Sequence, residues 1–149
     1  MIAMGEEVLI DEREKAIRAA AVIDTDGCIY IRKAKCVVTC IVRMTDGAIP
    51  IWLKQEYGGS ICFRQPKLSQ GVASRRPEWV WTIAAQLAED FLNSILPFLL
   101  VKRRQADCAL MLRKLQGREF KTKLLEVKRE QWEPYYHHMR ELNSPGFCL

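Results

Sequence analysis

The chain has 149 residues, 49% of them hydrophobic, and a formal net charge of +5. This length suits one domain with a hydrophobic core, expected over residues 1–149 with the core unit at about 11–117 and a helical extension at about 118–149. The most apolar run, residues 91–101, is too short to cross a membrane, and the acidic start lacks the basic region of a signal peptide. We therefore expect an intracellular protein, cytoplasmic or organellar, with no secretion signal.

The positive charge is unevenly distributed. Residues 1–26 carry three basic and seven acidic side chains, a sum of −4, whereas residues 27–85 carry nine and three, a sum of +6. The remaining residues, 86–149, sum to +3. The excess falls on a segment expected to form strands, as a nucleic-acid reader built on a sheet requires, although a solvated basic surface is the alternative.

The first expected element is a helix from Asp11 to about Asp24. Asp11 is a suitable N-cap, and acids in the first turn complement the positive end of the helix dipole. Four residues at helical spacing form the candidate seam between two copies, with a core helix as the alternative. They are Ile17, Ala20, Ala21 and Asp24.

Gly27 ends this helix, and two strands follow at 28–33 and 37–44. Side chains alternate along a strand, so Ile29 and Ile31 should face the core. The outward residues on these strands are Cys28, Tyr30, Arg32, Thr39, Ile41 and Arg43.

The second half of the chain predicts a helix, two more strands and then helices. Pro50 opens the helix, which Gly58-Gly59 ends. Trp79 and Trp81 share one strand face and either fill the core or meet DNA. The expected ranges are strands at 61–65, with Arg64 outward, and 78–84, a polar loop at 66–77, and helices at 85–96, from Pro97 to about 115, and 121–140.

The six cysteines predict neither disulfides nor a zinc site. They stand at 28, 36, 40, 62, 108 and 148, without a Cys-x-x-Cys pair. Several fall within apolar strand patterns of an apparently intracellular protein, which favours buried free thiols.

The stretch Ala19-Ala20-Ala21-Val22-Ile23-Asp24-Thr25-Asp26-Gly27 combines small residues with two acids at a helix end. It resembles the motif of the LAGLIDADG homing endonucleases, with Ile23-Asp24-x-Asp26-Gly27 as the closest match. Later pieces follow that family's order and approximate spacing, namely Trp52-Leu53-Lys54, Tyr57-Gly58-Gly59-Ser60-Ile61, Trp79-Val80-Trp81-Thr82-Ile83 and Ile95-Leu96-Pro97-Phe98-Leu99 before Lys102.

The resemblance implies an α+β fold, an αββαββα unit with a curved four-stranded antiparallel sheet. One face of such a sheet would lie in the major groove of double-stranded DNA, where base edges are distinguishable. Because the chain has one copy of the motif, the family pattern implies a homodimer joined through the motif helix. It would recognise a nearly palindromic site, with one Asp26 from each copy.

The activity implied is metal-dependent hydrolysis of DNA phosphodiester bonds, in the manner of an intron- or intein-type homing endonuclease. Asp26 and the backbone carbonyl of Thr25 or Gly27 would hold Mg²⁺, in whose place Mn²⁺ or Ca²⁺ could bind. Lys102 stands where the family places a basic residue near the attacking water; a solvent-facing lysine is the alternative. Relatives carry a polar residue at the end of the second strand where this chain has Met44, with Arg43 or Thr45 as stand-ins.

Nine residues are predicted to contact DNA. Arginine can bond guanine through two donors, whereas lysine more often contacts phosphate. The nine are Tyr30, Arg32, Lys33, Thr39, Arg43, Arg64, Lys67, Arg75 and Arg76.

Two other classes of function remain open. One is a non-cleaving nucleic-acid-binding protein on the same fold, either an RNA maturase or a transcription regulator. The other is an unrelated basic metal-binding domain in which Asp24 to Gly27 form a turn or part of a calcium loop. The lack of further Asp or Asn at alternate positions after Gly27 argues against an EF-hand.

Overall fold

Helix α1 (Glu12–Asp26) opens the part of the chain that the structure describes. That part comprises residues 11–65, 76–117 and 125–145 of a computed structural model. The N-cap prediction is confirmed, because Asp11 Oδ1 accepts a hydrogen bond of 2.7 Å from the backbone N–H of Glu14. The helix extends to Asp26, two residues beyond the predicted end, and the Gly27 N–H still bonds to carbonyls of its last turn.

One face of α1 is packed inside the chain. Its buried residues, Ala16, Ala19, Ala20 and Ile23, recur at the i, i+3, i+4, i+7 spacing of a helical stripe. The opposite side carries Ile17, whose side chain is 43% exposed, and the exposed Ala21. The buried stripe is thus rotated by about one residue from the predicted seam, so Ala20 belongs to the core.

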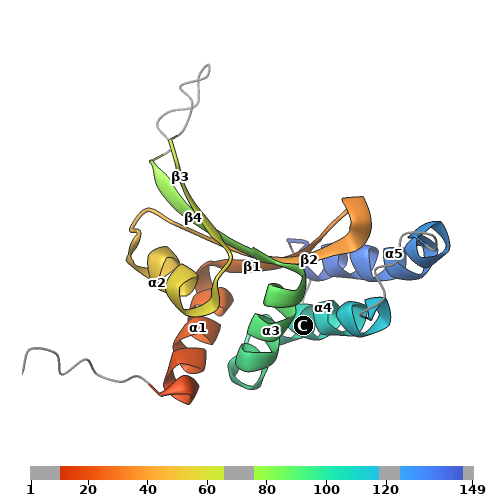
Figure 1. The fold of residues 1–149 in the computed structure, drawn as a ribbon, viewed down its shortest axis with the longest axis horizontal. Helices are drawn as coiled ribbons and strands as arrows, with labels where there is room; N and C mark the ends of the chain where they lie inside the picture. Colours follow the sequence, from red (N-terminus) through yellow and green to blue (C-terminus); the bar gives the residue numbers. More distant parts are fainter. Residues whose placement is uncertain (1–10, 66–75, 118–124, 146–149) are drawn as a thin grey trace, which may run out of the picture.

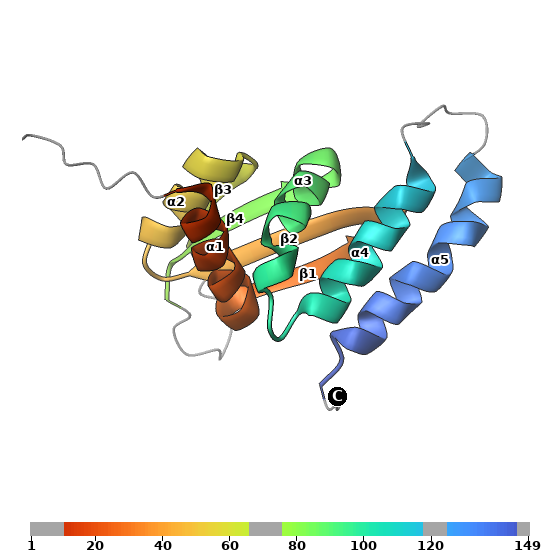
Figure 2. The same cartoon turned by 90° about the horizontal axis from the view of Figure 1, so that it is seen from below.

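The four strands form one antiparallel sheet in the order β1-β2-β4-β3. This confirms the predicted four-stranded antiparallel sheet. Figure 1 shows α1 to α4 on one side of it, and Figure 2 shows the same helices seen from below. The strands are β1 (Gly27–Arg32), β2 (Val37–Met44), β3 (Ser60–Arg64) and β4 (Glu78–Ala84).

The helix-covered face of the sheet holds the large apolar side chains. Ile29 and Trp81 are fully buried there, and the Trp81 indole N–H donates to the Gly58 carbonyl at 2.8 Å. Trp79 lies on the same face, partly buried beside Phe63 with ring centroids 5.0 Å apart. Trp81 is therefore a core residue, and no described helix covers the other face (Figure 1).

The start of helix α2 differs from the prediction, whereas helix α3 agrees with it. Helix α2 (Ala48–Tyr57) starts two residues before Pro50, because Asp46 Oδ1 accepts the Ala48 N–H at 2.8 Å. Helix α3 (Ala85–Ile95) agrees with the prediction to one residue and continues as the short 3₁₀ segment η2 (Leu96–Phe98).

Helix α4 (Arg103–Gln116) begins later than predicted, and Gly117 ends it as expected. Residues 99–102 form a connecting loop instead of its first turn. Helix α5 (Leu125–Leu142) runs beside α4 (Figures 1 and 2), and Trp132 and Met139 join the same core cluster. Among the residues described, no helix is both long and apolar enough to span a bilayer.

Two adjacent glycines form the turn between α2 and β3, and their substitution tests how closely this turn is packed. Both have positive φ, 80° at Gly58 and 86° at Gly59. A Cβ on Gly59 would lie 2.4 Å from the Thr82 carbonyl oxygen, whereas one on Gly58 meets only a Leu87 methyl at 3.8 Å. Gly59→Ala should therefore lower the free energy of unfolding by about 2 kcal/mol more than Gly58→Ala, measured by urea denaturation. Equal losses would contradict this packing.

Candidate nuclease centre and nucleic-acid interface

The two acids of the motif have different surroundings. Asp24 is half-buried, and its carboxylate accepts three backbone N–H groups: Leu100 at 2.8 Å, Val101 at 3.0 Å and Lys102 at 2.9 Å. Asp26 is exposed. Residues two apart in a helix do not share a face, which explains the difference. Asp24 therefore anchors the loop before α4, and Asp26 remains accessible.

The Asp26 carboxylate has free coordination capacity. Among the described residues it contacts only the Thr25 hydroxyl, 3.2 Å from Oδ2. That hydroxyl also lies 2.9 Å from the Ala21 carbonyl oxygen, and its single proton can serve one acceptor at a time. Carboxylate and backbone carbonyl oxygens are the donors that Mg²⁺ and Ca²⁺ prefer, so this donor set fits such an ion.

Lys102 is directed at the same helix end. It is the N-cap residue of α4, and its ammonium donates to the carbonyl oxygen of Gly27, where α1 passes into β1. This carbonyl was one of the two predicted metal-ligating carbonyls. Lys102 thus lies beside the motif, and its contact is to Gly27, not to the Asp26 carboxylate.

Arg43 lies at the same end of the sheet. The last β1–β2 pair is Gly27 with Val42, so the next residues along the two segments are Asp26 and Arg43. Burial raises the pKa of the Cys28 thiol, and the positive charges of Lys102 and Arg43 oppose that rise. Asp26 is therefore placed among basic groups at the edge of the open sheet face. Met44 points to the helix-covered side, because it has the opposite strand parity.

The described residues of one copy do not bring three metal-ligating side chains together. Over residues 11–65, 76–117 and 125–145, no group of three His, Cys, Asp or Glu side chains could hold a metal ion. Of the cysteines with free thiols in this part of the chain, Cys40 and Cys108 are buried as predicted, whereas Cys28 is half-buried and Cys62 is exposed. Within these residues, Asp26 is therefore not part of a cluster of three ligating side chains.

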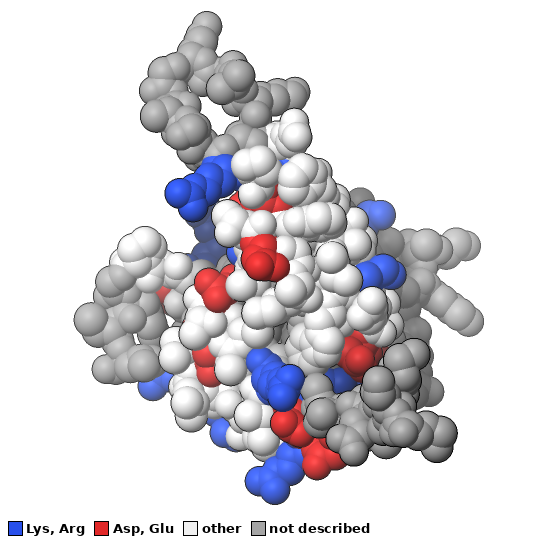
Figure 3. Space-filling view, turned by 90° about the vertical axis from the view of Figure 1, so that its left-hand side faces the viewer, with Lys and Arg blue, Asp and Glu red and all other residues white. Residues whose placement is uncertain are grey.

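The open face of the sheet carries most of the predicted DNA contacts. Alternation along paired strands places Arg32, Arg43 and Arg64 on this face, all exposed. Lys33 and Arg76 are exposed just beyond the strand ends. Figure 3, which views the molecule from its left-hand side in Figure 1, shows Lys and Arg side chains near the upper left of the described surface. Lys67 and Arg75 fall outside the described residues.

Thr39 is a correction to the predicted interface. Its strand parity is that of the open face, but its exposed fraction is 0%. It lies between Tyr30 and Ala84 on the neighbouring strands, and its hydroxyl donates to the Val37 carbonyl at 3.1 Å. Without exposed surface, the Thr39 side chain cannot read a base in this conformation.

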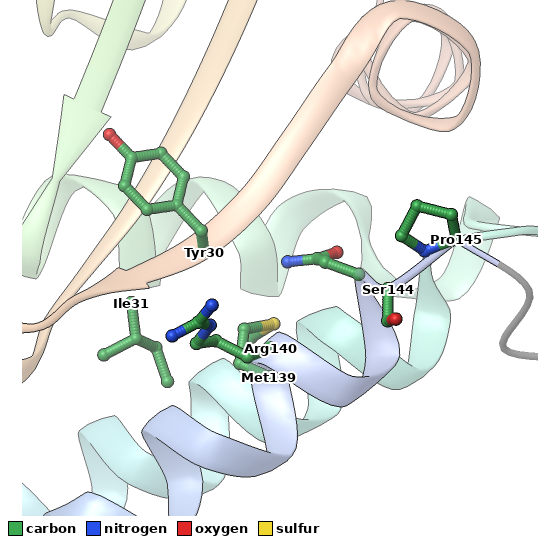
Figure 4. A pocket seen from close by; sticks show the side chains of 7 residues that line it. Tyr30, Ile31, Met139, Arg140, Ser144 and Pro145 are labelled. Atoms are coloured by element: carbon green, nitrogen blue, oxygen red, sulfur yellow. The ribbon is translucent and has the colours of Figure 1, made fainter.

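Tyr30 borders a pocket at the edge of the same face. The pocket has a volume of about 320 Å³ and lies between β1 and the end of α5 (Figure 4). Asn143 in its wall donates to the Ile29 carbonyl at 2.8 Å. The other lining residues are Ile31, Met139, Arg140, Ser144 and Pro145.

Lys35 is a basic residue that the sequence prediction did not include. It is exposed at the tip of the β1–β2 hairpin, in the 3₁₀ segment η1 (Ala34–Cys36). Lys35 and Cys36 have positive φ values of 63° and 48°, and Gln116 of α4 donates to the Cys36 carbonyl at 2.8 Å. A lysine in the short segment between the two predicted strands was the available signal.

The exposed residues of the loop before α4 were also missed. Leu100 is 88% exposed and Val101 58% exposed, although both are apolar. Their backbone N–H groups bond to Asp24, so they lie beside the foot of α1. An apolar run directly before Lys102 was the sequence signal.

Comparison with solved structures identifies the architecture. The homing endonuclease I-CvuI, in complex with its target in the presence of calcium, matches with a TM-score of 0.66 at 17% identity over 93% of this chain and 88% of that chain. The chain has the homing-endonuclease fold. These neighbours are LAGLIDADG homing endonucleases, which confirms the predicted fold class.

Two further complexes with this fold are similar. I-CvuI bound to the I-CreI target with magnesium, with the DNA not cleaved, gives a TM-score of 0.67 at 16% identity over 93% and 87% of the two chains. The archaeal intron-encoded homing endonuclease I-Vdi141I, complexed with DNA, gives 0.68 at 13% identity over 92% and 89%. No protein-family profile matches this chain, and no curated protein matches it by sequence.

The different contacts of the two acids predict different effects on stability. Asp24→Ala removes the acceptor for three N–H groups and should lower the free energy of unfolding by about 2 kcal/mol. Asp26→Ala removes only an exposed carboxylate and should change it by less than about 0.5 kcal/mol. Chemical denaturation of both variants measures this difference. Similar losses would show that Asp24 does not anchor the loop.

Proposed function

We propose that this protein is a homodimeric, site-specific endonuclease that hydrolyses double-stranded DNA with a divalent metal ion, as an intron- or intein-type homing endonuclease does. The observation that carries the proposal is the free, exposed carboxylate of Asp26 at the foot of α1. It lies beside Lys102 and Arg43, on the fold shared with I-CvuI and I-Vdi141I.

DNA would lie along the open face of the sheet. Its three exposed arginines and the flanking Lys33 and Arg76 supply positive charge for phosphates and donors for base edges. Lys35, at the tip of the β1–β2 hairpin, would add a phosphate contact at one end of this face. One end of the face would then contact the outer base pairs of a half-site, and the other end would contact the inner base pairs.

The second copy would pack against the exposed side of α1. Ile17 and Ala21 on the helix, with Leu100 and Val101 beside its foot, form an apolar surface. Ala21 allows a close approach of two backbones. A two-fold axis along this helix side would bring two Asp26 carboxylates to one end of the seam, and thereby add a second carboxylate to the donors that the described residues of one copy provide.

The residues at this centre would have different roles in catalysis. Mg²⁺, held by Asp26 of both copies and the Thr25 carbonyl, would polarise a water and a phosphate oxygen when bound. Asp24 fixes the backbone of residues 100–102 and so positions Lys102. The Lys102 ammonium and the Arg43 guanidinium would stabilise the negative charge that develops on the phosphate.

A non-cleaving nucleic-acid-binding protein is the second candidate. It is favoured by the lack of a three-ligand acidic or thiol cluster within the described residues of one copy. Such a protein would keep the basic sheet and bind nucleic acid without a contribution from Asp26. The two functions are therefore separated by the role of Asp26 in cleavage.

The Asp26→Asn variant tests the nuclease. Duplexes cleaved by the wild-type protein in Mg²⁺ would first be selected from a randomised library. Asp26→Asn should reduce cleavage of these duplexes by at least about 1,000-fold, because it removes the charged metal ligand, and should largely retain binding in a gel-shift assay with Ca²⁺.

Asp107→Asn, at an exposed acid of α4, is the matched control and should cleave normally. Unchanged cleavage by Asp26→Asn would remove Asp26 from the mechanism. Sequence-specific binding without any cleavage by the wild-type protein would favour the second candidate.

The Ala21→Glu variant tests the dimer. A symmetric seam would bring the two new carboxylates together in an apolar contact, so the variant should sediment as a monomer and lose cleavage, whereas the wild type sediments as a dimer. Met111→Glu, an equivalent change at a 59% exposed position of α4, should remain dimeric. A monomeric wild-type protein with full activity would exclude this assembly.

A further inference from the structure

The Gly27 carbonyl oxygen already accepts a hydrogen bond from a positively charged group. The half-buried Lys102 reaches it from the N-cap position of α4. Its backbone cannot easily withdraw, because the Asp24 carboxylate accepts the Lys102 N–H at 2.9 Å as well as the two N–H groups before it. The ammonium is therefore a fixed cation at the end of α1.

Lys102 does not neutralise Asp26 by direct pairing. None of the ion pairs among the described residues joins these two side chains. The carboxylate thus stays open to a metal. The Lys102 ammonium lies at the carbonyl of the next residue, Gly27, and Arg43 adds positive charge on the strand side, so a metal at Asp26 would approach both cations. Like charges this close repel, more strongly where water is partly excluded.

We propose that Lys102 acts as a resident cation that excludes divalent metal from the Gly27 carbonyl and weakens metal binding at Asp26 until DNA is bound. This inference rests on the proposed function. The metal would then use Asp26 and the Thr25 carbonyl, and the Gly27 carbonyl would remain with the ammonium. A DNA phosphate brings the negative charge that offsets Lys102 and Arg43, so tight metal binding follows DNA binding.

Binding of Mn²⁺ to the DNA-free protein, followed by electron paramagnetic resonance, tests the proposal without a cleavage assay. Lys102→Met removes the ammonium and frees the carbonyl, so it should bind Mn²⁺ about tenfold more tightly than the wild type. Lys102→Gln, which removes the same charge with a polar side chain, should show the same gain. Thermal melting of both variants establishes that they are folded.

Arg103→Met is the matched control. It removes the same charge one residue away, at an exposed position, and should change the Mn²⁺ affinity less than twofold. Adding Asp26→Asn to Lys102→Met should abolish the gain in Mn²⁺ affinity, which would show that this gain arises at the motif. In the wild type, a target duplex selected for binding should tighten Mn²⁺ binding more than it does in Lys102→Met.

The outcomes separate this proposal from the proposed function. If Asp26→Asn loses Mn²⁺ binding but Lys102→Met binds it no more tightly than the wild type, competition by Lys102 is excluded and the nuclease proposal stands. An equal gain in Arg103→Met would also overturn the proposal, since net charge alone would explain it. If Asp26→Asn binds Mn²⁺ as tightly as the wild type with duplex present, the metal centre itself is wrong.

Discussion

The bonds from the Asp24 carboxylate to three successive backbone N–H groups hold the candidate site together. They join α1 to the loop before α4 across more than 70 residues of sequence. Of these donors, the Lys102 N–H belongs to the N-terminus of α4, where the first N–H groups have no partner within the helix. The other two lie in the loop that precedes it. The loop is consequently fixed at the point where it presents Lys102 to Gly27, and the exposed Leu100 and Val101 beside α1.

The division between the two acids follows from helix geometry. Positions 24 and 26 lie on opposite sides of the last turn of α1, so one carboxylate meets the loop and the other meets solvent. Gly27 then passes directly into β1, which leaves Asp26 at the edge of the sheet face that carries the arginines. An acid positioned by a buried helix, next to a basic sheet, is a useful arrangement for chemistry on a phosphodiester.

Local signals were sufficient to predict the strands, and the family resemblance supplied the sheet. The bounds of β2 and β4 agree with the prediction because turn residues delimit both segments, and the alternation in β1 places Ile29 and Ile31 in the core as expected. The face of α1 was harder to predict. Small residues lie on more than one side of the helix. A helical stripe through Ala19 and one through Ala20 and Ala21 therefore have the same period, and only tertiary packing decides which of them is buried.

Contacts between distant segments explain the remaining differences. Thr39 has outward parity, yet residues on both neighbouring strands cover it. The late start of α4 depends on Asp24, and the contact of Lys102 with Gly27 joins residues 75 apart in sequence. The partners of each interaction are far apart in the sequence. Periodicity and capping rules apply to short stretches, so they could identify the residues but not these pairings.

The sheet edges bear on how two copies would meet. β1 is an edge strand, but Asn143 at the end of α5 donates to its Ile29 carbonyl, and Met139 packs nearby in the core. β3 at the other edge has only five residues and ends in the charged Arg64. Short, charged or covered edges disfavour pairing between sheets. Under the proposed function, the remaining apolar surface at the foot of α1 would then be the contact for a second copy, and it would leave both sheets open to the same duplex.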